Sequence, residues 1–231
     1  MKRPLILLSL LLSAFASLAQ ARVAEIKLIY FQKPDGAPQS MHIYSNGVYM
    51  EELQVPSRQF SMTVPVKGRG ELTLTFADQK FEGKADEVEE MLRAYPTVQI
   101  PEGWNKVLLL AFEDQGNKKL PVKLLKVNAS GNEFRPGDIH FINLSKYGVV
   151  GPVGKKELKL RPRKSMLIRG AATVGEEFDV RVDIIKPESK MKRQSFFYQR
   201  WKTTPDRKQM VFIYEPDGGR PSYTSVSIKG F

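Results

Sequence analysis

The chain has 231 residues, no cysteine and a formal charge of +11. Without cysteine, a fold stapled by disulfides is excluded, so the core must come from apolar side chains. The excess of 36 Lys and Arg over 25 Asp and Glu favours anionic partners such as a membrane surface or an acidic polysaccharide. The same excess is also typical of a lysine-rich surface with no partner.

Residues 1–21 are predicted to be a secretory signal peptide. Lys2 and Arg3 precede the apolar run 5–12, and residues 19–21 form an A-x-A cleavage site. This run is shorter than the ~20 residues of a spanning helix, so we expect no transmembrane span after cleavage. The protein is expected to be exported, to the periplasm or to the cell surface and medium. Export argues against nucleic acid as a partner.

Short strands separated by Gly and Pro turns are predicted for the first half of the mature chain. One helix is expected at 86–95, where Val88, Met91, Leu92 and Tyr95 share a face. Asp86, with Glu89 three residues on, resembles a capping box, and Pro96 stops the helix. The expected strands are 26–31, 41–44, 53–55, 60–64, 70–76 and 107–112.

The second half repeats this order of segments. The sequence pairs 26–29 with 122–125, His42 with His140, 53–56 with 158–162, 60–64 with 164–168, 70–74 with 175–180 and 112–116 with 214–218. A repeat of about a hundred residues has the size of an immunoglobulin-like sandwich. We therefore predict an all-β fold of two tandem immunoglobulin-like β-sandwich domains, 22–118 and 119–231. Two alternatives stay open: residues 120–127 close the sheet of the first domain, or the chain forms one larger sandwich or barrel.

The segment 186–208 is the strongest candidate for a binding site, because basic and aromatic residues alternate there. Cations attract a polyanion and flat rings stack on sugars. The alternative is a long hairpin whose aromatic side chains are core. The candidate residues for a ligand or partner are Lys192, Arg193, Phe197, Tyr198, Arg200, Trp201 and Lys202.

Opposite charge marks the places where the two halves differ most. The first half carries an acidic helix and the second carries the basic segment 186–208. The two are expected to touch, either between the domains or between two copies of the chain, which predicts self-association.

Other features point to structure more than to chemistry. The run 155–169 fits a half-buried edge strand with a charged outer face, with anion binding as the alternative. His42 and His140 are expected to be structural, with no metal site and no cofactor, because no second ligand lies near either in sequence. The chain lacks G-x-S-x-G, H-E-x-x-H, P-loop and G-x-G-x-x-G motifs, so we expect no enzyme; a carboxylate pair of an unrecognised hydrolase is the alternative.

A resemblance supports this interpretation. F-x-P-G-D at 134–138, N-L-S at 143–145 and Trp201 before a last apolar strand resemble uncharacterised secreted bacterial β-sandwich proteins. The resemblance implies export and a β fold, and no activity. We expect a non-enzymatic interaction or scaffold protein of the cell envelope, whose partner is another envelope protein or an anionic polymer. The alternative is a module that binds an anionic polymer or glycan through 186–208.

Overall fold

The computed structural model describes residues 21–31, 33–131, 133–187, 192–216 and 219–231. The predicted signal peptide lies outside the described residues apart from Ala21. The described residues form an all-β fold of two sandwiches, each made of two four-stranded sheets. The fold class expected from the sequence is therefore confirmed as a two-domain sandwich.

The first sandwich pairs the sheet β4-β1-β7-β8 with the sheet β3-β2-β5-β6. Its elements are β1 (Ala21–Tyr30), β2 (Ser40–Ser45), β3 (Val48–Gln54), β4 (Val64–Arg69), β5 (Leu72–Ala77), α1 (Ala85–Leu92), β6 (Thr97–Ile100), β7 (Lys106–Glu113) and β8 (Val122–Asn128). Strand β5 shows the expected alternation, because Leu72, Leu74 and Phe76 are all buried on one face.

The second sandwich pairs the sheet β12-β9-β15-β16 with the sheet β11-β10-β13-β14. Its strands are β9 (Ile139–Asn143), β10 (Gly148–Val153), β11 (Lys156–Leu160), β12 (Ser165–Ile168), β13 (Glu177–Ile185), β14 (Arg193–Lys202), β15 (Arg207–Tyr214) and β16 (Ser222–Lys229). Each strand occupies the place of the strand eight before it. In both sandwiches the first strand also runs parallel to the seventh, β1 with β7 and β9 with β15.

The repeat is thus present in the topology. The first two pairs expected from the sequence, 26–29 with 122–125 and His42 with His140, are each wrong by one strand. Strand β8 holds residues 122–125 and pairs with β7, so its counterpart is β16 and not β1. His42 lies in β2 and His140 in β9, so the two histidines are not equivalent. The later pairs, from residue 53 onward, follow the topology. Short amphipathic strands resemble one another, and their pattern alone does not identify the partner. The pairing of β8 favours the alternative in which 120–127 close the first domain's sheet.

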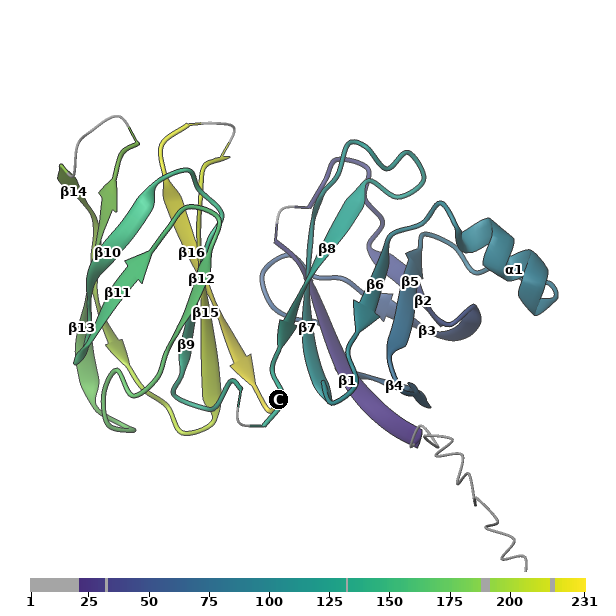
Figure 1. Cartoon of the computed structure of the whole chain (residues 1–231), viewed down its shortest axis with the longest axis horizontal. Helices are drawn as coiled ribbons and strands as arrows, with labels where there is room; N and C mark the ends of the chain where they lie inside the picture. The colour runs from purple at the N-terminus through teal and green to yellow at the C-terminus, as the bar shows by residue number, and fades with distance from the viewer. Residues whose placement is uncertain (1–20, 32, 132, 188–191, 217–218) are drawn as a thin grey trace, which may run out of the picture.

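The four sheets stack as four layers, with the sheets of β1 and β9 in the middle (Figure 1). Each sandwich has its own core. A third apolar core lies between the sandwiches. In β7, Leu109 belongs to the first core, whereas Leu108 and Leu110 belong to the third. This double burial explains why residues 107–112 are apolar on both faces.

Helix α1 differs from the prediction at both ends. It begins after Lys84, whose backbone N–H donates to the Glu87 carboxylate at 3.3 Å. The capping pair is therefore Lys84 and Glu87, two residues before the expected pair. The helix ends at Leu92, and Met91, expected on its apolar face, is 38% exposed. It lies at the end of the molecule farthest from β14 (Figure 1), so the expected contact between the acidic helix and the basic segment does not occur within one chain.

Candidate functional site

The basic and aromatic segment forms β14, the edge strand of an outer sheet. The ring of Phe197 is 8% exposed and belongs to the second core. Phe196 and Trp201 are partly buried and pack against the same core. Of the four aromatic residues, Tyr198 alone is largely exposed, at 55%. The strand therefore presents one ring to solvent and turns the others toward the core.

The cations of β14 face carboxylates on β13. Arg200 Nε lies 3.4 Å from Asp179 Oδ1, and the hydrogen bond to Asp179 raises the pKa of Arg200. Lys202 lies opposite Glu177 in the strand register. Lys192 and Arg193 are exposed at the start of the strand. Cations of β14 and carboxylates of β13 thus balance each other over much of this sheet face. Lys190, in the same basic segment, lies outside the described residues.

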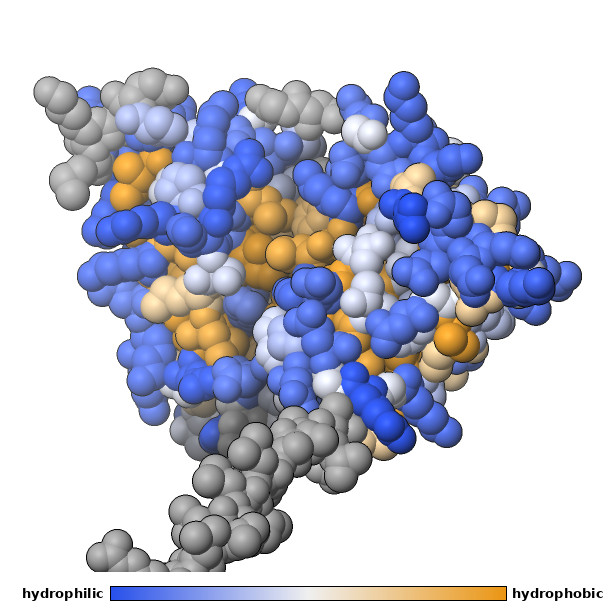
Figure 2. Space-filling view, turned by 45° about the vertical axis from the view of Figure 1, so that its right-hand side comes forward, coloured by the Kyte–Doolittle hydropathy of each residue, from blue (hydrophilic) through white to orange (hydrophobic). Residues whose placement is uncertain are grey.

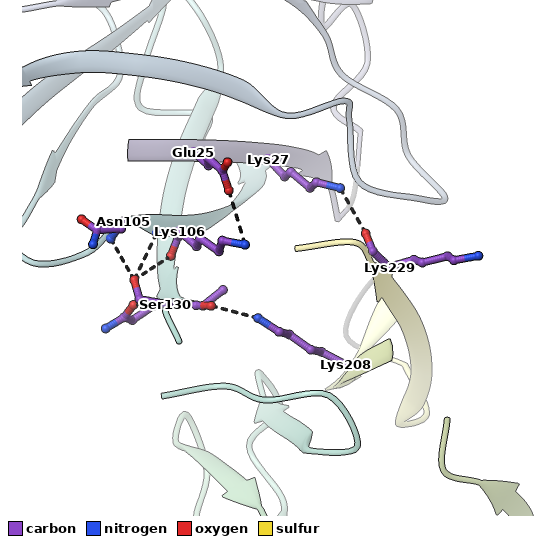
Figure 3. Close-up of polar contacts among 9 residues, drawn as sticks. Glu25, Lys27, Asn105, Lys106, Ser130, Lys208 and Lys229 are labelled. Atoms are coloured by element: carbon purple, nitrogen blue, oxygen red, sulfur yellow. Dashed lines mark hydrogen bonds and ion pairs between the residues drawn. The ribbon is translucent and has the colours of Figure 1, made fainter. Parts of the chain in front are cut away.

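Polar contacts fix the two sandwiches to each other at the end near residue 130 (Figure 3). Lys208 Nζ, at the start of β15, donates to the Ala129 carbonyl at 2.9 Å. Lys27 Nζ, in β1, lies 3.5 Å from the Lys229 carbonyl. Ser130 Oγ accepts from the backbone N–H groups of residues 105 and 106 at 2.8 and 3.1 Å. These bonds join strands from both halves.

Three ammonium groups surround one phenyl ring at this junction. The Nζ atoms of Lys27, Lys106 and Lys208 lie 5.2, 5.5 and 5.9 Å from the ring centroid of Phe231. Lys208 is 3% exposed, and burial, with the nearby charge of Lys106, lowers its pKa to about 8. Glu25 lies 3.5 Å from Lys106 Nζ. The cluster is occupied by its own contacts, and we assign it to joining the sandwiches.

An apolar groove runs along β8 on one side of the junction. Near the start of β8, a cavity of about 530 Å³ is lined by rings that include Phe31 and Tyr214. Near its end, a cavity of about 300 Å³ is lined by Phe134 and His140. Leu125 lines both cavities and is 40% exposed. Figure 2 shows apolar surface between the hydrophilic surfaces of the two sandwiches.

Both walls of the groove end in strands with open edges. Strand β8 is the last strand of its sheet, and β12 is the last of the facing sheet. In the part of the chain that the structure describes, no strand pairs with either outer edge. The open backbone groups of an edge strand are ready to pair with another strand.

Charged groups lie at the wider end of the groove and come from both sandwiches. Lys123 and Glu113 belong to the first half, and Arg163 and Glu215 belong to the second. Glu215 Oε1 lies 3.2 Å from Lys146 Nζ. The groove therefore combines apolar walls with both positive and negative side chains at the end that holds the larger cavity.

His140 lines the smaller cavity, near the end of β8. Burial lowers the pKa of His140 to about 4, so the imidazole is neutral at ordinary pH. Its ring makes an edge contact with Phe134 at 5.8 Å. Its Nδ1 atom is buried and has no hydrogen-bond partner among the described residues. Within the same residues, no group of three or more His, Asp or Glu is arranged to hold a metal ion.

Sequence reasoning missed the groove, because its lining comes from segments that are far apart in the chain. A weak signal was present in 122–128, where Leu124 and Leu125 put apolar side chains on both faces of one strand.

In comparisons with known proteins, the chain matches no family model and no curated protein. No helix in the described ranges is long and apolar enough to cross a membrane.

Proposed function

We propose that the protein is an exported, non-enzymatic interaction module of the cell envelope, and that it holds an extended peptide segment of a partner protein in the groove along β8. The observation that carries this proposal is the placement of an apolar groove beside an unpaired strand edge. Export is supported by the leader pattern of residues 1–21 and by the resemblance to secreted bacterial β-sandwich proteins. We propose also that the sandwiches are immunoglobulin-like, in line with their size and strand number.

Strand addition explains how such a segment would bind. A peptide that pairs with β8 would extend the sheet β4-β1-β7-β8 by one strand. Every second side chain would then point into the groove, where Leu125, Phe31 and Tyr214 provide apolar contacts. Main-chain bonds would give affinity and the alternate side chains would give specificity. Lys123 and Arg163 would pair with acidic residues of the segment.

The alternative function, binding of an anionic polymer by the face of β14, has less support. That face offers one exposed ring, Tyr198, and its Arg200 is already paired with Asp179. Stacking on sugars gains most from several exposed rings in a row.

The test uses a panel of nine-residue peptides with Val or Leu at every second position and Glu between them. Binding is measured by calorimetry, and hydrogen exchange locates the bound peptide. We expect binding to slow exchange of backbone amides in Val122–Asn128. Leu125→Glu places a charge in the groove and should weaken binding at least about tenfold.

Two matched controls accompany this test. Val48→Glu changes an apolar residue that is 60% exposed and lies in β3, away from the groove, and it should leave affinity unchanged. Peptides of the same composition with all apolar residues in one block should not bind. The proposal is wrong if no alternating peptide binds, or if binding is equally strong in both Glu variants.

A further inference from the structure

The net charge of the protein belongs to the second sandwich. Residues 22–128 contain 14 Lys and Arg and 14 Asp and Glu, whereas residues 129–231 contain 20 and 11. The first half is therefore neutral, the second carries +9, and the remaining +2 of the formal charge comes from Lys2 and Arg3. Such an asymmetry orients a molecule in the field of a charged surface.

The topology gathers many of these cations at one end of the second sandwich. Leu160 pairs with Val149, and Gly148 pairs with Ile185, which pairs with Arg193. The β11–β12 connection and the β13–β14 connection therefore lie at the same end. The β15–β16 connection joins them there, because β15 runs parallel to β9 and ends beside Asn143. The exposed cations of these three connections and strand ends are Arg161, Arg163, Lys164, Lys186, Lys192, Arg193 and Arg220.

Carboxylates are scarce among the described residues of this end. Glu215, near the β15–β16 turn, already pairs with Lys146, and Asp183, two residues before the end of β13, is half-buried opposite Ser195. At the opposite end, by contrast, Glu176 and Glu177 accompany Lys202. Glu188 and Asp217 lie outside the described residues. The two ends of one sandwich thus differ in charge, which a uniformly lysine-rich surface does not explain.

We propose that this cationic end, which we define by Arg161, Arg163, Lys164, Arg193 and Arg220, docks the protein on the surface of an anionic bilayer. The cations come from three separate connections at the end of a sandwich, so they form a broad array and not a track along one groove. Phe196 and Phe197, the rings of β14 nearest to Arg193, pack against the core, so Tyr198 is the single largely exposed ring of that strand. A planar field of phosphate groups matches such an array, whereas a single polymer chain needs a track with rings.

Vesicle binding tests this inference with the full mature chain. Vesicles of phosphatidylglycerol and phosphatidylethanolamine are compared with vesicles of phosphatidylcholine in a flotation assay. We expect binding to the anionic vesicles only, with loss of binding as salt rises to about 1 M, where charges are screened over about 3 Å. One cation near an anionic surface changes the partition coefficient about fivefold. The triple variant R161Q, K164Q and R193Q should therefore bind about a hundredfold more weakly.

The matched control removes three cations from the other end of the same sandwich. K155Q, K156Q and K202Q lower the net charge equally, and binding should fall less than about fivefold. Equal loss in both variants would show attraction by net charge alone and would overturn the proposal. So would binding to phosphatidylcholine, or preference for soluble polyphosphate over vesicles. The peptide assay is independent of this one, because Leu125 and Val48 are not changed here.

Discussion

The two sandwiches share one order of eight strands and differ in what fills the space between matching strands. In the first, α1 lies between β5 and β6; in the second, a direct hairpin joins β13 and β14. The first is neutral and the second carries the charge. In both, the two sheets enclose an apolar core. The difference teaches that the connections, which the core does not constrain, are free to differ between the two halves.

At the junction the two sandwiches are not independent. Ile29, Leu108 and Leu110 of the first half form one core with Met210 and Phe212 of the second. A face buried in this way cannot be exposed without a large cost in free energy. The two halves therefore share a core although their connections differ, and substitutions in that core test whether the halves unfold together.

The largest effect is expected for Phe212→Ala. Phe212 is fully buried in β15 and its ring lies 4.7 Å from that of Phe31. Its loss should lower the free energy of unfolding by about 3–5 kcal/mol. Urea unfolding is followed in variants that keep either Trp104 or Trp201, one reporter for each sandwich. Both reporters should shift together, because the core is shared.

Val48→Ala is the control for this change, since Val48 is 60% exposed. Its effect should stay within about 0.5 kcal/mol. A shift of the Trp201 transition alone would mean that the sandwiches unfold separately, and the junction would then be a contact and not a core.

A smaller effect, on the order of 3 kcal/mol, is expected from His140 in acid. Burial lowers its folded pKa to about 4, against 6.5 in the unfolded chain. As the pH falls from about 6.5 to about 4, the unfolded chain binds the proton first, and the folded state loses stability. His140→Gln should remove this part of the pH dependence. The measurement is the difference in unfolding free energy between wild type and variant from pH 7 to pH 4.

If that difference does not change with pH, the His140 imidazole is not buried as described. The wall of the groove that His140 forms would then be open to water. Because other acidic groups titrate in both proteins, the difference isolates the histidine.

The prediction from sequence was good where the residues of a single strand show its hydrophobic pattern. Alternation in residues 70–76 identified β5 and its buried face, and the apolar run 107–112 identified β7 as a central strand. Strand alternation puts Phe197 and Trp201 on one face of β14, and the structure shows this face against the core. Phe196 departs from that pattern, because the register shifts between Val182 and Asp183 and turns its ring toward the core.

The features that the sequence did not reveal are contacts between segments that lie far apart in the chain. The shared core needs the outer face of β7 to lie against β15, and no local pattern names that partner. The groove needs Phe31, Leu125 and Tyr214, which lie about ninety residues apart in turn, at one edge of two sheets. The alignment of His42 with His140 failed for the same reason, since a strand's neighbours are set by tertiary pairing and not by its own residues.

The smallest effect is expected at the buried contact between the halves, Lys208. Lys208→Met keeps an apolar stem beside Phe134 and Phe231 and removes the hydrogen bond to Ala129. It also removes the cost of burying a charge, so stability at pH 7 should change by about 1 kcal/mol or less. The folded pKa of Lys208, about 8, lies below the unfolded value of 10.5. Wild type should therefore gain stability relative to the variant as the pH rises from about 8 to about 10.5.

Lys208→Arg separates the charge from the bond. Arginine keeps its proton throughout this range, so this variant should also lack the gain in stability above pH 8. At pH 7 it should be less stable than Lys208→Met, because a larger cation stays buried. A gain above pH 8 that persists in both variants would show that Lys208 is not the group that titrates. The two halves would then be joined by their apolar core, with the buried lysine contributing nothing that depends on its charge.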